Sequence, residues 1–216
     1  MRERLAYAFC LNFFVAVAEG ASLFEVARLR GVMMLTFYTE CANILALLTS
    51  LIFCVAAVRG LLQARPIPHW VRTLRLVSVV MLGVVVGVVV LVLAPLLGGG
   101  GGLTVLLFGG TMFYHHLFCP ALSMLSFFLL EGGAAPRRWQ VALSLLPTVL
   151  YAVALYLLNA SAVVSGPYPF FMVRDLPLWL IVAAGALIFL GSLGGAILLR
   201  RLAARADERM RGISPT

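Results

Sequence analysis

The chain has 216 residues, of which 63% are hydrophobic and only 11% charged, and its mean hydropathy is +1.08. A water-soluble domain of this size cannot bury so much apolar surface, whereas a lipid bilayer accommodates it. The net charge of +8 comes from 16 arginines without a single lysine. Cofactors that form a Schiff base with a lysine amine, such as retinal and pyridoxal phosphate, are therefore excluded.

Apolar stretches of 18 or more residues predict membrane helices. The chain has six, at about Leu5–Phe24, Val32–Val58, Leu74–Leu97, Leu103–Leu130, Trp139–Val164 and Leu176–Leu199. The first has no small-residue cleavage site, so we interpret it as a span and not as a secretory signal. The third is almost entirely Val and Leu, which we interpret as a lipid-facing scaffold. The fold class that follows is all-α: a polytopic six-transmembrane-helix bundle in residues 1–201 with a polar cytoplasmic tail, 202–216.

The arginines orient this bundle. If the N-terminus is cytoplasmic, 13 of the 16 arginines fall in the N-terminus, the segments Arg59–Arg75 and Glu131–Arg138, and the tail. Only Arg28, Arg30 and Arg174 fall on the other side. The positive-inside rule then predicts a multi-pass protein of the cell (inner) membrane with both ends in the cytoplasm. Because the basicity is a topology signal, we expect no nucleic-acid partner.

Polar groups inside the spans are the candidates for function, since ionisable groups are costly in lipid. They are Glu19, Glu40, His115 and His116. The four cysteines also lie in spans, without a CxxC pair, and predict neither a disulfide nor a metal site. We therefore expect no metal and no cofactor.

The predicted helices bring several of these groups to similar depths. Thr39 lies roughly 10 Å along the second span, and the two histidines roughly 18–20 Å along the fourth, at about 1.5 Å per residue. Thr39 and Asn43 share one helix face, whereas His115 and His116 diverge by about 100°. Pro120 frees the carbonyl of His116, which favours a kink there. A buried polar pocket between the outer half and the midplane is the expectation.

Three blocks of sequence resemble bacterial relatives of the androgen-induced-gene family of membrane proteins. Residues 38–45, YTECANIL, resemble a Phe-Thr-x-x-x-Asn-Leu-Leu segment of these relatives. Residues 116–120, HLFCP, resemble the His-x-x-x-Pro that follows, and residues 166–171, GPYPFF, resemble a later Tyr-Pro-Phe. The order and rough spacing of the blocks agree over most of the chain.

Mammalian members of this family are multi-pass hydrolases that cleave fatty-acid esters with a threonine and a histidine. The resemblance implies that the threonine is Thr39 and the histidine His116, or His115 if the animal spacing is the guide. A membrane lipid or lipid ester is then the expected partner. Other residues expected to contact substrate or catalytic groups are Glu40, Asn43, Tyr114, Tyr168 and Phe170. Asn43 or Tyr114 is a candidate oxyanion donor, and Glu40 or Glu19 a candidate to orient the histidine.

Other interpretations stay open at this point. An acyltransferase would use the same residues with a lipid alcohol in place of water. A transporter of protons or small molecules would use Glu40 and the histidines without chemistry. Thr39 can bond back to its own helix, and the Tyr168 loop can be an interfacial aromatic anchor. The sequence predicts no oligomeric state.

Overall fold

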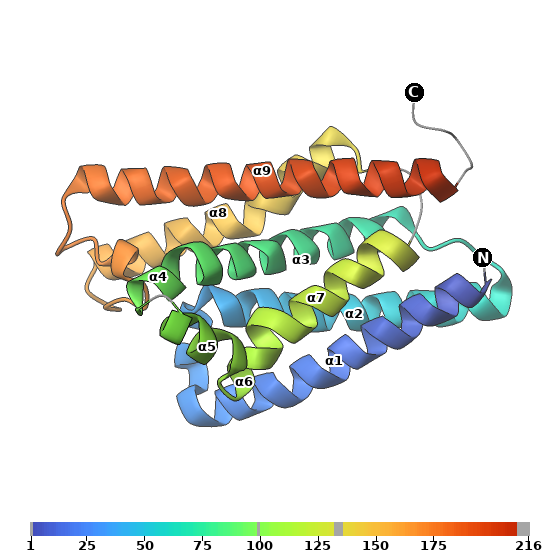
Figure 1. Cartoon of the computed structure of the whole chain (residues 1–216), viewed down its shortest axis with the longest axis horizontal. Helices are drawn as coiled ribbons and strands as arrows, with labels where there is room; N and C mark the ends of the chain where they lie inside the picture. Colours follow the sequence, from blue (N-terminus) through green and yellow to red (C-terminus); the bar gives the residue numbers. More distant parts are fainter. Residues whose placement is uncertain (1, 99, 132–135, 211–216) are drawn as a thin grey trace.

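The computed structural model describes residues 2–98, 100–131 and 136–210, with side chains described up to residue 205. Every regular element in these ranges is helical, and six helices are long and apolar enough to cross a membrane. They form an elongated bundle in which the N-terminus and the α2–α3 connection lie at the same end (Figure 1). The predicted all-α architecture is therefore confirmed, with six helices that could span a membrane, as expected of a multi-pass membrane protein.

The elements follow one another closely. Helix α1 (Arg2–Arg30) continues through the 3-10 helix η1 (Gly31–Thr36), and α2 (Tyr38–Gln63) runs back. Helix α3 (His69–Val88) passes through the π-helical turn η2 (Val89–Leu93) into α4 (Ala94–Leu96), and the short α5 (Gly100–Phe108) follows. The fourth span comprises α6 (Thr111–Phe113), the π-helical turn η3 (Tyr114–Phe118), α7 (Cys119–Leu125) and the π-helical turn η4 (Ser126–Leu130). The chain ends with α8 (Arg138–Ala160), the 3-10 turn η5 (Pro169–Phe171) and α9 (Leu178–Met210).

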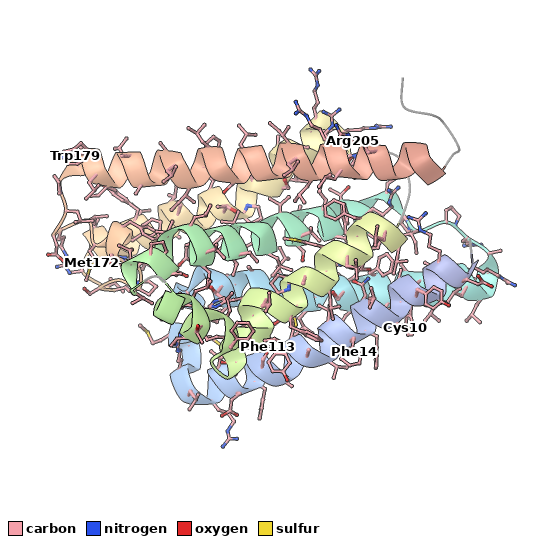
Figure 2. All side chains as sticks on the ribbon, viewed as in Figure 1. Cys10, Phe14, Phe113, Met172, Trp179 and Arg205 are labelled. Atoms are coloured by element: carbon pink, nitrogen blue, oxygen red, sulfur yellow. The ribbon has the colours of Figure 1, made fainter. Side chains whose placement is uncertain are left out.

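Large apolar side chains cover the outside of the bundle. Phe14 and Phe24 on α1, and Leu187 and Leu190 on α9, are each at least 60% exposed. In water such a surface would aggregate, whereas in a bilayer lipid tails cover it. Trp179 and Arg205 lie near opposite ends of α9 (Figure 2), so they bracket its apolar stretch.

The interpretation of the third span as lipid-facing scaffold is wrong. Helix α3 packs against α2, α7, α8 and α9 and lies at the centre of the bundle (Figure 1). Half of the most apolar part of this span is buried inside the protein, compared with 11% of the most apolar part of α9. A helix that is apolar on every side suits both lipid and a protein interior, so its sequence does not distinguish the two.

The second and fourth spans begin later than expected. Phe37 is extended, with φ −98° and ψ 128°, so η1 stops there and α2 starts at Tyr38. The stretch Leu103–Leu130 is not one helix, because Gly109 and Gly110 separate α5 from α6. A Cβ at Gly109 would lie 2.5 Å from the Val105 carbonyl oxygen, and Gly110 has a φ of +58°. Both positions therefore require glycine.

These later starts change the predicted depths. Thr39 is the second residue of α2, and His116 lies only about 8 Å from the start of its span at Thr111. The two residues thus lie near one end of the bundle and not toward its middle.

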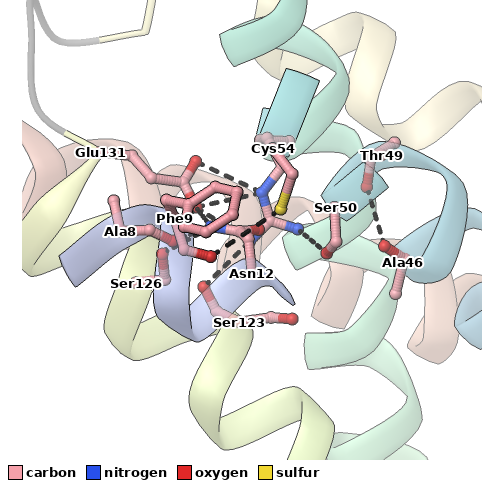
Figure 3. Close-up of polar contacts among 11 residues, drawn as sticks. Ala8, Phe9, Asn12, Ala46, Thr49, Ser50, Cys54, Ser123, Ser126 and Glu131 are labelled. Atoms are coloured by element: carbon pink, nitrogen blue, oxygen red, sulfur yellow. Dashed lines mark hydrogen bonds and ion pairs between the residues drawn. The ribbon is translucent and has the colours of Figure 1, made fainter. Parts of the chain in front are cut away.

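A buried ion pair joins helices at the opposite end (Figure 3). Arg75 of α3 and Glu131, which follows η4, meet at 2.9 Å, and both side chains are at most 2% exposed. By sequence, both belong to the inner charged segments, Arg59–Arg75 and Glu131–Arg138, at the ends of spans. The Glu131 carboxylate also accepts hydrogen bonds from Asn12 and Ser126, and Arg75 donates to the Ser50 hydroxyl. The network therefore links α1, α2, α3 and η4.

The predicted tail is helical in its first part. Helix α9 continues to Met210, beyond the expected end of the last span. Residues 211–216 of the tail and 132–135 of the predicted inner connection lie outside the described residues.

Candidate active site

Thr39 and His116 meet at the α5 end of the bundle. The Thr39 Oγ1 lies 3.4 Å from Nε2 of His116. Thr39 is partly buried in the first turn of α2, and His116, on η3, is 4% exposed. This separation is long for a hydrogen bond, but it suits a site without substrate, in which catalytic hydrogen bonds are often loose.

A backbone carbonyl selects the tautomer of His116. The Nδ1 atom lies 2.7 Å from the carbonyl oxygen of Leu106 on α5. A carbonyl only accepts, so Nδ1 must carry a proton and donate it. In the neutral ring Nε2 then has the free lone pair, and this atom is the one that faces the Thr39 hydroxyl.

The local backbone explains why the side chains of His115 and His116 point in different directions. Pro120 has no N–H to donate to the carbonyl of His116, and the helix widens into the π-turn η3, where the N–H of Cys119 bonds to the Tyr114 carbonyl. Such π-turns are frequent at functional sites. His116 turns toward α2 and α5, whereas the Nε2 of His115 lies 2.9 Å from the Ser22 hydroxyl of α1.

His115 therefore belongs to a separate polar cluster. Its Nε2 also lies 3.6 Å from Oε2 of Glu19, and the side chains of both residues are at most 2% exposed. This contact ties η3 to α1. The structure does not bring His115 or Glu19 to Thr39.

Tyr168 reaches the site from the loop between α8 and α9. Its phenol oxygen accepts the N–H of Tyr38 at 3.1 Å, at the start of α2. Burial raises the pKa of Tyr168 to about 12, while hydrogen bonding with Thr39 acts in the opposite direction. The phenol is therefore neutral near pH 7 and keeps a proton to donate. Phe170 stacks on it, with ring centroids 5.3 Å apart.

A buried amide holds this loop in place. The side chain of Asn159 accepts the N–H of Gly166 at 2.9 Å and donates to the carbonyl of the same residue at 2.8 Å. The sequence alone gives no sign of this role, since both loop partners of Asn159 are backbone groups.

The other expected site residues lie around this centre with different partners. Glu40 is 3.4 Å from Nη1 of Arg30, whose guanidinium lies over the Phe37 ring. Asn43 donates to the carbonyls of Thr39 and His115 and so joins α2 to η3. Tyr114 is 40% exposed and packs edge-on against Phe113 and Phe118. The structure does not bring Tyr114 to Thr39.

A small cavity of about 40 Å³ opens beside Thr39. That volume is sufficient for about one water molecule. Its polar lining comprises Tyr38, Thr39, Thr148, Tyr151 and Tyr168. The cavity therefore offers a place for a water molecule or a small reacting group next to the hydroxyl.

An apolar groove of about 340 Å³ lies next to this cavity and shares part of its lining. Val84, Val88 and Ile188 line both spaces. The groove runs between α3 and α9 and is otherwise lined mainly by Val, Leu and Gly. Its size falls in the usual range of ligand pockets.

Sequence reasoning missed two partners of the site. The Leu106 carbonyl carries no side-chain signal, and its approach to His116 depends on the turn at Gly109 and Gly110. Arg30 follows an apolar run, so the sequence suggests only a charged residue that flanks a membrane span. No protein-family model, curated protein or solved structure matches the chain. The resemblance of the three sequence blocks to the androgen-induced-gene family therefore stays a prediction.

Proposed function

We propose that the chain is an integral membrane hydrolase that cleaves a fatty-acyl ester, with Thr39 as nucleophile and His116 as general base. The observation that carries the proposal is the approach of Thr39 Oγ1 to a His116 Nε2 whose other ring nitrogen donates to Leu106. The arginine distribution supports a place in the cell (inner) membrane with both termini in the cytoplasm. The resemblance to the androgen-induced-gene family supports the class of substrate.

The first step transfers the acyl group to the enzyme. His116 Nε2 takes the hydroxyl proton of Thr39 while Oγ1 attacks the ester carbonyl carbon. The tetrahedral intermediate collapses as His116 returns the proton to the leaving alcohol oxygen, and an acyl-threonine ester remains. A water molecule, deprotonated by the same imidazole, then attacks this ester. The second tetrahedral intermediate collapses as His116 returns the proton to the Thr39 oxygen, and the fatty acid is released.

The charge on the carbonyl oxygen needs partners in such an apolar setting. Tyr168 accepts the N–H of Tyr38 and hydrogen-bonds with Thr39. Its phenol therefore lies beside the nucleophile, where it can donate its proton to a developing oxyanion. The first turn of the 26-residue α2 adds the partial positive charge of a helix N-terminus. Asn43, in contrast, directs its amide hydrogens to two backbone carbonyls. Tyr168 is therefore the better candidate donor.

The apolar groove between α3 and α9 suits the acyl chain. It shares Val84, Val88 and Ile188 with the lining of the cavity at Thr39. A chain lying in the groove would present its carboxyl end to the hydroxyl. The substrate would come from the surrounding lipid, since α9 is the least buried of the candidate spanning helices among the described residues.

Labelling with a fluorophosphonate probe tests the proposal. Such a probe bonds covalently to an activated hydroxyl, and mass mapping of the adduct identifies the residue. We expect an adduct on Thr39 in the parent, and its loss in Thr39→Ala and His116→Gln. Labelling of Thr39→Ala at the parent level would refute the proposal.

Two residues of this chain serve as matched controls. Thr36 is three residues from Thr39, and its hydroxyl donates back to the Met33 carbonyl, while its own carbonyl accepts from Tyr151. Thr36→Ala removes the hydroxyl and keeps the carbonyl, so it should keep full labelling. His115→Gln changes the neighbouring imidazole, which contacts Ser22 and not Thr39. If His115→Gln abolished labelling and His116→Gln did not, the assignment of the base would be wrong.

A further inference from the structure

A further pocket, separate from the cavity and the groove, lies at the end of the bundle away from Thr39. We call it the α2–α3 pocket; it has a volume of about 470 Å³. Its lining is Leu51, Ile52, Val55, Ala56, Arg59, Gly60, Gln63, Arg65, Pro66, Pro68, Trp70 and Val71. None of these residues belongs to the candidate active site.

The turn between α2 and α3 builds the polar end of this pocket. Ala64 adopts a left-handed conformation with φ +53° and reverses the chain. The Arg65 carbonyl then lies so close to α2 that a Cβ at Gly60 would be 2.9 Å from it. Gly60 thereby lets the turn fold back over the helix end, which places Arg59 and Arg65 in the lining of one pocket.

Both arginines are free to bind an anion. Their side chains are exposed, and in the part of the chain that the structure describes neither has a hydrogen-bond or ion-pair partner. The pocket lining contains no acidic residue. Trp70 beside them is 59% exposed, as is typical of an indole at the level of lipid head groups.

Apart from Gln63, the rest of the pocket lining is apolar and extends toward the middle of the membrane span. Leu51 and Val55 stand four residues apart on the face of α2 that carries Arg59. From Leu51 to Arg59 the helix rises about 12 Å. The pocket thus has a cationic end at head-group level and an apolar side along the lipid tails.

From this arrangement we infer that the α2–α3 pocket binds one anionic phospholipid. Arg59 and Arg65 bind its phosphate, for which guanidinium groups have matching geometry, and one acyl chain lies along Leu51 and Val55. Basic pockets between membrane helices are known sites for anionic lipid head groups. This inference does not depend on the proposed hydrolase activity.

Native mass spectrometry of the purified full chain tests the site. The protein in detergent is mixed with equal amounts of dioleoyl phosphatidylglycerol and dioleoyl phosphatidylcholine and is then released from the micelle in the spectrometer. The two lipids have the same acyl chains and differ in charge. The parent should retain the phosphatidylglycerol preferentially. In Arg59→Gln/Arg65→Gln this preference should fall about 25-fold, at roughly fivefold for each basic residue near an anionic ligand. Each single variant should lose about fivefold.

Arg201→Gln/Arg205→Gln removes the same charge from two exposed arginines of α9 and should keep the parental preference. Val55→Trp fills the apolar part while both arginines remain, and it should lower retention of both lipids. An unchanged preference in Arg59→Gln/Arg65→Gln, or an equal loss in the α9 control, would overturn the inference. So would full retention by Val55→Trp, since no acyl chain would then lie in the pocket.

Discussion

Replacing Glu131 by glutamine removes the counter-charge of a fully buried arginine while nearly preserving side-chain shape. Arg75 makes three contacts of 2.9–3.3 Å with this carboxylate. Breaking such a pair leaves an uncompensated buried charge, at a cost of about 3–5 kcal/mol. We expect Glu131→Gln to lose that much unfolding free energy, measured by reversible unfolding in mixed detergent and SDS micelles with helix content as the signal.

An exposed pair in the same chain is the control. Arg28 and Glu25 are 3.9 Å apart, with side chains 66% and 50% exposed, so Glu25→Gln should change the unfolding free energy by less than about 1 kcal/mol. The combined Arg75→Met/Glu131→Gln variant removes both charges and should regain at least about 2 kcal/mol of the loss. Strictly additive losses in this double-mutant cycle would refute the reasoning, because the two groups would then not interact.

Three further changes test the site and its surroundings. Tyr168→Phe should lower kcat about 10²-fold by removing one oxyanion donor. Because the pKa of Tyr168 is about 12, the phenol is protonated below that pH, so this loss of kcat should be constant between about pH 6 and pH 10. Gly191 lines the groove, so Gly191→Leu should slow the hydrolysis of long-chain esters more than that of short-chain esters. Gly185 does not line it, so Gly185→Leu should leave the ratio of the long-chain rate to the short-chain rate unchanged. Equal effects of the two substitutions on this ratio would contradict the groove assignment. Gly110→Ala strains a backbone with φ +58° and should lower the unfolding free energy by about 1–3 kcal/mol, while Gly20→Ala, with open space around it, should be close to neutral.

Hydropathy alone predicted the number and approximate places of the spans, because six apolar runs of membrane length are unambiguous. It did not show that α3 lies in the centre, since valines and leucines face protein and lipid equally well. It also missed the helix start at Tyr38, because Phe37 is as apolar as its neighbours although its backbone is extended.

Helical spacing and the resemblance led to Thr39 and His116, but the partners of these residues come from tertiary structure. His116 depends on the Leu106 carbonyl ten residues earlier, and a carbonyl leaves no trace in the side-chain pattern. Arg75 and Glu131 are 56 residues apart in sequence and stand at span ends, where charged residues normally meet water. Only the packing of α1, α2, α3 and η4 places them out of solvent.

The shallow position of Thr39, in the first turn of α2, has a consequence for how a lipid would be handled. Ester linkages of membrane lipids lie just beneath the head groups, at the level of the first turn of a spanning helix. A lipid moving sideways within its leaflet would therefore present the scissile bond at the right height without being lifted out or pulled deeper. After cleavage the fatty acid would remain among its neighbours, while a small alcohol would leave directly into the adjacent aqueous phase.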